Sequence, residues 1–79
     1  MDKVKTINIK ENIMLIDPAV KSNTKIFIND NLFCEIAGDI DEQIYKIKSL
    51  VIIFHVTKIK IDTSGFGIAF YDKLNEIFA

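Results

Sequence analysis

The residues best suited to chemistry are Asp62, Thr63 and Ser64, which place one carboxylate beside two hydroxyl groups. The residues before them, Lys58–Ile61, alternate polar and apolar as in a half-buried strand. Apolar residues recur after them at helical spacing and predict a helix from near Ser64 to the chain end: Phe66, Phe70, Leu74 and Ile77. The free N–H groups and the positive dipole end of such a helix stabilise an added phosphate. We therefore expect a turn here that can accept a phosphate.

The other reactive side chains are isolated from one another. His55 is the only histidine and lies in an apolar run without a nearby serine, so we interpret it as structural rather than catalytic. Cys34 is the only cysteine, which rules out an intrachain disulfide and indicates a small buried apolar residue. One cysteine and one histidine form no recognised metal-ligand set. The run Gly65–Gly67 lacks the lysine of a phosphate-binding loop. We expect no catalytic residue, no metal site and no cofactor.

The composition predicts one small globular domain, residues 1–79, with 49% hydrophobic and 27% charged residues. The net charge is −1, and lysines and acidic residues are interspersed along the chain, which argues against a nucleic-acid-binding patch. The longest apolar run, Leu50–Phe54, is too short to span a bilayer, and the N-terminus lacks the apolar core of a signal peptide. We expect a cytoplasmic protein without membrane insertion.

The N-terminal part of the chain predicts two β-hairpins. Val4–Ile9 and Ile13–Ile16 are strand-like segments around a polar stretch, and a polar loop follows them. Lys25–Ile28 and Leu32–Ala37 flank Asn29–Asn31, whose residue types tolerate the left-handed backbone that tight hairpins need. The second hairpin is the better supported of the two.

The C-terminal part predicts two helices and a further pair of strands. Asp39 or Asp41 is expected to cap a helix over Glu42–Leu50, which explains the two acids better than an acid–base pair does. Val51–Val56 is rich in β-branched and aromatic residues, so we interpret it as a strand buried on both faces at the sheet centre. A short strand and the last helix surround Asp62. The order predicts an α/β (α+β) fold, a small mixed β-sheet packed by two helices.

The Asp62 turn also has a purely structural interpretation. Thr63 and Ser64 would then cap the last helix, because their hydroxyl oxygens accept hydrogen bonds from its first N–H groups. Gly65 and Gly67 would let the helix and strand backbones pack closely. Residue types alone favour this structural interpretation over a phosphate site.

Two stretches of the chain carry recognisable motifs. Ile61–Gly67 reads Ile-Asp-Thr-Ser-Gly-Phe-Gly, which resembles the Asp-Ser-Ser/Thr-Gly-Leu-Gly motif at the strand-to-helix turn of STAS domains, the anti-anti-sigma-factor family. Leu32–Asp41 resembles the family's early strand, which ends in Gly-Glu-Leu-Asp before the first helix. The two matches follow the family's order and together cover somewhat more than half of the chain. The resemblance implies a STAS-like part over residues 25–79, preceded by an N-terminal hairpin and loop over residues 1–24.

The resemblance also implies a regulatory function without enzymatic activity. Thr63 takes the position that a partner kinase phosphorylates in anti-anti-sigma factors, and Ser64 is the second choice. A phosphate adds about −1.5 to −2 charges beside Asp62 and would alter docking by repulsion. The partner would be an anti-sigma-kinase-like protein or another regulator. The implied partner-binding residues are Asp62, Thr63, Ser64, Gly65, Phe66, Asp39 and Asp41.

Some features differ from the family. Thr63 stands where serine is usual in anti-anti-sigma factors. In this respect the chain resembles other branches of the family, including stressosome scaffold proteins and the STAS subunit of lipid-transporting ABC systems. The first helix is expected to be short, and the family's following strand and final helix are missing. One expectation is that the N-terminal segment supplies the missing sheet edge, and another is that two chains share strands as a homodimer. Alternative functions are a stand-alone inhibitor, such as a phage anti-defence or immunity protein that acts by steric blocking, an accessory subunit of a transporter, and a small enzyme or ligand-binding protein using Gly65–Gly67.

Overall fold

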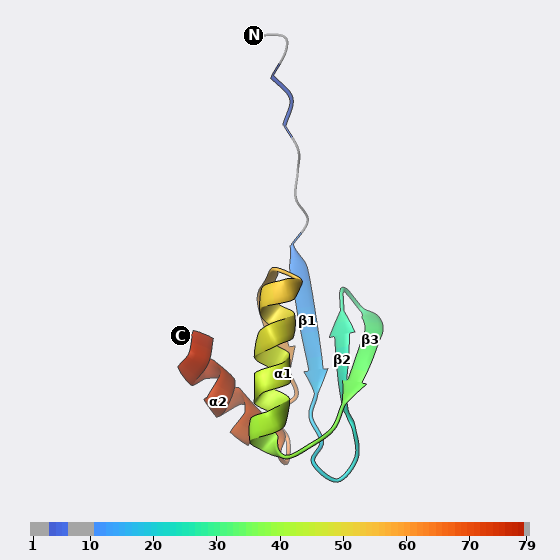
Figure 1. The fold of residues 1–79 in the computed structure, drawn as a ribbon, viewed down its shortest axis with the longest axis vertical. Coiled ribbons are helices and arrows are strands. Elements are labelled where there is room, and N and C mark those ends of the chain that lie inside the picture. The colour runs from blue at the N-terminus through green and yellow to red at the C-terminus, as the bar shows by residue number, and fades with distance from the viewer. Residues whose placement is uncertain (1–3, 7–10, 79) are drawn as a thin grey trace.

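The computed structural model describes residues 4–6 and 11–78. Over this part of the chain, one mixed sheet is packed by two helices (Figure 1). The elements are β1 (Asn12–Asp17), β2 (Thr24–Ile28), β3 (Asn31–Ile36), α1 (Ile40–Ile53), β4 (Val56–Ile61) and α2 (Gly67–Phe78). The structure confirms the predicted α+β fold. No helix of the described residues is long and apolar enough to cross a membrane.

The strand order is β3-β2-β1-β4. β1 pairs antiparallel with β2 and parallel with β4, and β2 pairs antiparallel with β3. β1, β3 and β4 therefore run in the same direction, and their carboxyl ends lie together at one end of the sheet, at the bottom of Figure 1. The loop after β1 and the starts of α1 and α2 consequently lie at this carboxyl end of the sheet.

The β2–β3 connection is the tight hairpin that the sequence predicts. Asn29 has a φ of 51° and Asp30 a φ of 69°, the left-handed values of a type I′ turn. The Asn29 side chain also accepts a hydrogen bond from the Ile13 N–H at 2.9 Å and donates one to the Asn12 side chain at 2.9 Å. The turn is therefore tied to the start of β1.

The hydrophobic core lies between one face of the sheet and both helices. Met14, Ile16 and Ile26 from the sheet and Phe70 from α2 are completely buried. The remaining buried apolar residues belong to β3, α1 and α2: Ile36, Ile44, Ile47, Val51 and Leu74. Leu15, on the opposite face of β1, is exposed. One face of the sheet is thus covered by helices, as the alternation of buried and exposed residues in β1 requires.

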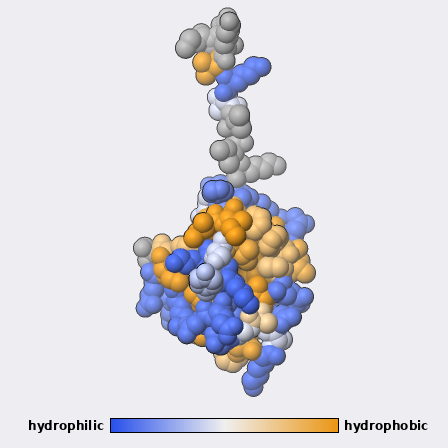
Figure 2. Space-filling model, viewed as in Figure 1, coloured by the Kyte–Doolittle hydropathy of each residue, from blue (hydrophilic) through white to orange (hydrophobic). Residues whose placement is uncertain are grey.

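The prediction of a central strand over Val51–Val56 is wrong. Its first residues form the last turn of α1, and His55 has a φ of 49° that separates the helix from β4. The reason is helical periodicity, because the apolar stripe of α1 continues through Ile40, Ile44, Ile47 and Val51. Ile52 and Ile53 lie outside that stripe and are exposed, and Figure 2 shows hydrophobic surface over this end of α1. β-branched composition alone misassigned the segment.

The segment Ile13–Ile16 does not pair as the predicted N-terminal hairpin. It lies in β1, where Met14–Ile16 pair with β2 on one side and with β4 on the other. The other half of that hairpin, Val4–Ile9, lies mainly outside the described residues. β1, rather than Val51–Val56, is therefore the strand that occupies the sheet centre together with β2.

Candidate functional site

The turn between β4 and α2, Asp62–Phe66, is held by hydrogen bonds of Asp62. The Asp62 N–H donates to the Ile16 carbonyl of β1 at 3.3 Å. The Asp62 carboxylate accepts from the Ser64 hydroxyl at 2.7 Å and from the Ser64 N–H at 2.9 Å. The Ser64 hydroxyl, followed by the Ser64 N–H, lowers the pKa of Asp62 below its ordinary value of 3.8. Asp62 is therefore ionised at neutral pH, and its charge is localised at the turn.

The two glycines of the turn are required for different reasons. Gly65 has a φ of 55°, and a Cβ there would meet nothing within 4 Å, so its role is conformational. A Cβ on Gly67 would lie 1.7 Å from the Asp62 carbonyl oxygen and 3.6 Å from Pro18 Cγ. Gly67 thus allows the helix backbone to lie directly against the turn, which confirms the close-packing interpretation for this residue.

The start of α2 differs from the prediction. The helix begins at Gly67 rather than near Ser64, and the Gly67 N–H donates to the Ser64 carbonyl at 2.9 Å. The Ser64 hydroxyl donates to Asp62, and among the described residues no N–H group of α2 donates to the Ser64 hydroxyl oxygen, so Ser64 does not cap the helix.

The outer side of the turn is open to solvent. Thr63 and Phe66 are both exposed, with 54% of the accessible surface of Phe66 remaining. Among the described residues, the side-chain hydrogen bonds at this turn join Asp62 and Ser64 and do not involve the Thr63 hydroxyl. An aromatic ring and a hydroxyl group are thus presented to solvent by a turn that is held by the hydrogen bonds of Asp62.

Asp39 and Asp41 lie at the start of α1, at the same carboxyl end of the sheet. The Asp39 carboxylate caps α1 by accepting from the Glu42 N–H at 2.9 Å, as expected. This hydrogen bond is the main cause of a lowered pKa for Asp39. Asp41 forms an ion pair with Lys73 of α2 at 3.0 Å, which sequence reasoning did not identify. The predicted site residues thus lie at one end of the sheet, and the ion pair joins the first turn of α1 to α2.

A buried polar network connects the loops at this end of the sheet, and the sequence analysis did not predict it. Thr24 and Gln43 are both completely buried and hydrogen-bonded to each other. The Gln43 amide donates to the Ala19 carbonyl at 2.8 Å and to the Gly38 carbonyl at 2.9 Å, while Thr24 Oγ1 accepts from the Ala19 N–H at 2.8 Å. The network joins the loops after β1 and β3 to α1. The available signal was a glutamine on the apolar face of α1.

His55 and Cys34 lie away from the turn. His55 is exposed at the junction of α1 and β4 and is not part of a strand, contrary to the sequence interpretation. Cys34 is half-buried against the core, and this burial raises the pKa of its thiol. Over residues 4–6 and 11–78, no group of three or more histidine, cysteine, aspartate or glutamate side chains is placed to hold a metal ion.

Comparisons with protein-family models, with curated proteins and with solved structures find no match to this chain. The STAS resemblance of Ile61–Gly67 and Leu32–Asp41 therefore stays a prediction. A functional interpretation has to rest on the chain's own residues and their geometry.

Proposed function

We propose that this chain is a regulatory protein-binding domain, not an enzyme, that docks a partner protein through the Asp62–Gly67 turn as STAS domains do. The supporting observation is that the turn is both held in place and exposed. It is held by the Asp62 hydrogen bonds and by the contact of Gly67, and its residues Asp62–Phe66 are exposed. A preformed turn lowers the entropy cost of association, and exposed aromatic residues are common anchors of protein interfaces.

Phosphorylation of Thr63 is the proposed control of this docking. The Ser64 hydroxyl already donates to Asp62 at 2.7 Å, so a phosphate on Ser64 would remove this donor and repel the carboxylate. Thr63 is exposed, and its phosphate can remain in water. In this step a partner kinase transfers the γ-phosphoryl group of ATP to the Thr63 hydroxyl, which gives up its proton. The added charge would disfavour a partner that buries the turn beside Asp62.

Two measurements test the proposal. Incubation with an anti-sigma-type kinase and ATP, followed by intact mass, should add one phosphate that Thr63→Val abolishes and Ser64→Ala retains. A photo-cross-linking residue at Phe66 should capture the same kinase, whereas one at Tyr45, an exposed aromatic residue on α1, should not. If the chain gains no phosphate and forms no complex on a sizing column, the kinase-substrate version is wrong.

A second candidate is a stand-alone inhibitor that acts by steric blocking. It is favoured by the exposed apolar side chains of α1, Tyr45, Ile52 and Ile53, which present a surface away from the turn. For this function Thr63→Ala would leave inhibition intact, whereas Ile52→Asp would weaken it. The opposite result would support docking through the turn. Under either function we propose a cytoplasmic location, where Cys34 would remain a reduced thiol.

A further inference from the structure

β4 is an edge strand of the sheet. Among the described residues it pairs with β1 alone, because the strand order ends at β4. The outer edge of such a strand presents backbone N–H and C=O groups that can pair with an added strand. β3 forms the opposite edge, but a register irregularity interrupts its pairing with β2 near Phe27. β4 is regular from Lys58 to Ile61 and is therefore the better template.

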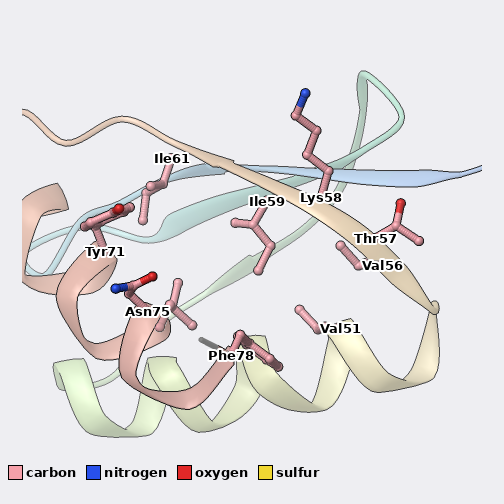
Figure 3. Close-up of a pocket in the computed structure, with 10 residues that line it drawn as sticks. Val51, Val56, Thr57, Lys58, Ile59, Ile61, Tyr71, Asn75 and Phe78 are labelled. Atoms are coloured by element: carbon pink, nitrogen blue, oxygen red, sulfur yellow. The ribbon is translucent and has the colours of Figure 1, made fainter.

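An apolar groove of about 400 Å³ runs along this edge on the helix side of the sheet (Figure 3). Its apolar lining comes from β4, α2 and the end of α1: Val51, Ile59, Ile61, Tyr71, Leu74 and Phe78. Tyr71 and Phe78 keep 45% and 42% of their surface exposed. The groove is thus a hydrophobic surface directly beside unpaired backbone groups.

The core-facing side chains of β4 are less buried than those of β1. Ile59 and Ile61 are only half-buried, although their register partners on β1, Met14 and Ile16, are completely buried. The core-facing rows of apolar residues therefore continue to the edge without being covered there. A further strand with apolar side chains on the groove side would cover Ile59 and Ile61, and each buried Å² of apolar surface contributes about 25 cal/mol.

The opposite face of β4 is basic. Lys58 borders the groove, and Figure 3 shows its side chain projecting to the opposite side of β4 from Ile59. Lys60 follows Lys58 on the same face, since alternate residues of a strand share a face. Both lysines are exposed. A strand added at this edge would meet apolar side chains on one face and two positive charges on the other.

We propose that the β4 edge and its groove bind an extended segment of a partner protein in which acidic and apolar residues alternate. The segment adds a fifth strand, with its apolar residues in the groove and its carboxylates beside Lys58 and Lys60. A second copy fits poorly, because antiparallel β4–β4 pairing with both grooves on one side sets lysine opposite lysine. The chain's own first ten residues hold three lysines and one acidic residue, so they carry the wrong charge too. This surface does not depend on the Asp62–Gly67 turn.

The test is a titration of the ¹⁵N-labelled chain with acetylated peptides of about six residues, the usual strand length. One peptide alternates valine and glutamate, and the other alternates valine and lysine. The glutamate peptide should shift the amides of Lys58–Ile61, Tyr71 and Phe78 in a saturable manner, and should bind at least about tenfold more tightly than the lysine peptide, a difference of about 1.4 kcal/mol.

Charge reversal provides the matched variants. Lys58→Glu with Lys60→Glu should reverse the preference between the peptides, while Lys21→Glu with Lys48→Glu, which changes the net charge equally at other exposed lysines, should not. Phe66→Ala should leave peptide binding unchanged, so failure of the docking turn and failure of this proposal are distinguishable. Absence of saturable shifts, shifts elsewhere on the chain, equal binding of both peptides, or self-association through β4 would each overturn the proposal.

Discussion

Replacing Gly67 with alanine tests the backbone contact on which the docking turn depends. The added Cβ would lie 1.7 Å from the Asp62 carbonyl oxygen, whereas real Cβ contacts stay beyond 3.0 Å, so the two atoms must separate by at least 1.3 Å. No side-chain rotation relieves this, because both atoms are fixed to the backbone. Overpacking of this kind costs about 3 kcal/mol. Gly67 is the first residue of α2, so alanine recovers at most the helix-interior gain of about 1 kcal/mol, which leaves a net loss of at least about 2 kcal/mol.

The loss is measured by thermal and urea unfolding followed by circular dichroism. For a domain of this size, about 2 kcal/mol corresponds to a Tm lower by roughly 8–16 °C. Ile68→Ala is the control, because Ile68 is an exposed neighbour in the same helical turn, and it should stay within about 0.5 kcal/mol of the parent chain. If Gly67→Ala is as stable as the parent, the helix does not rest on the turn, and the inference of a rigid docking surface fails.

Three further outcomes follow from the geometry. The pKa values of Asp39 and Asp62 are lowered in the folded chain, so on acidification the unfolded chain takes up protons first, and the contribution of these groups to the free energy of unfolding should be full above about pH 3.8 and fall as the pH drops through the lowered values. In urea unfolding measured at a series of acidic pH values, Asp39→Asn or Asp62→Asn should make the free energy of unfolding depend less on pH. An unchanged pH dependence would contradict the assignment of the lowered pKa values. Gln43→Leu removes the hydrogen bonds of the buried Gln43 amide to Thr24 and to the Ala19 and Gly38 carbonyls, while Thr24 keeps its hydrogen bonds to Ala19, so the free energy of unfolding in urea should fall by about 1–3 kcal/mol; a stable variant would show that the network is dispensable. Asp30→Val should cost about 1–2 kcal/mol because a β-branched residue resists the φ of 69°, while Asp30→Gly should be tolerated, and equal effects in thermal unfolding would contradict the type I′ turn.

Local chemistry was sufficient for several elements of the fold. The pair Asn29 and Asp30 predicted the β2–β3 hairpin, because these residue types tolerate left-handed backbone conformations. Asp39 or Asp41 was predicted to cap the first helix from their position before an apolar stripe, and the structure shows that Asp39 is the cap. The alternation of Lys58–Ile61 predicted the end of β4. In each case the decisive interaction lies within a few residues of the chain.

The candidate site was only partly predictable. The sequence located a turn between a strand and a helix at Asp62, and the structure confirms that position. The exposure of Thr63 and Phe66, the retention of the Ser64 hydroxyl by Asp62 and the approach of Gly67 came from the structure. These features depend on where the helix axis crosses the turn, which local patterns do not encode.

The sequence by itself determined the class of fold, one tight hairpin, the first helix cap and the position of the Asp62–Gly67 turn, because propensity, periodicity and capping act over a few residues. The tertiary structure decided which strand is central, how far α1 extends and which edge stays open. Val51 joins the helix because its side chain completes a stripe that is buried against the sheet. β1 is an interior strand because it pairs with β2 and with β4, and β4 lies at the edge because among the described residues it pairs with β1 alone. Such outcomes depend on contacts between segments far apart in the chain, whose burial energy outweighs local preference.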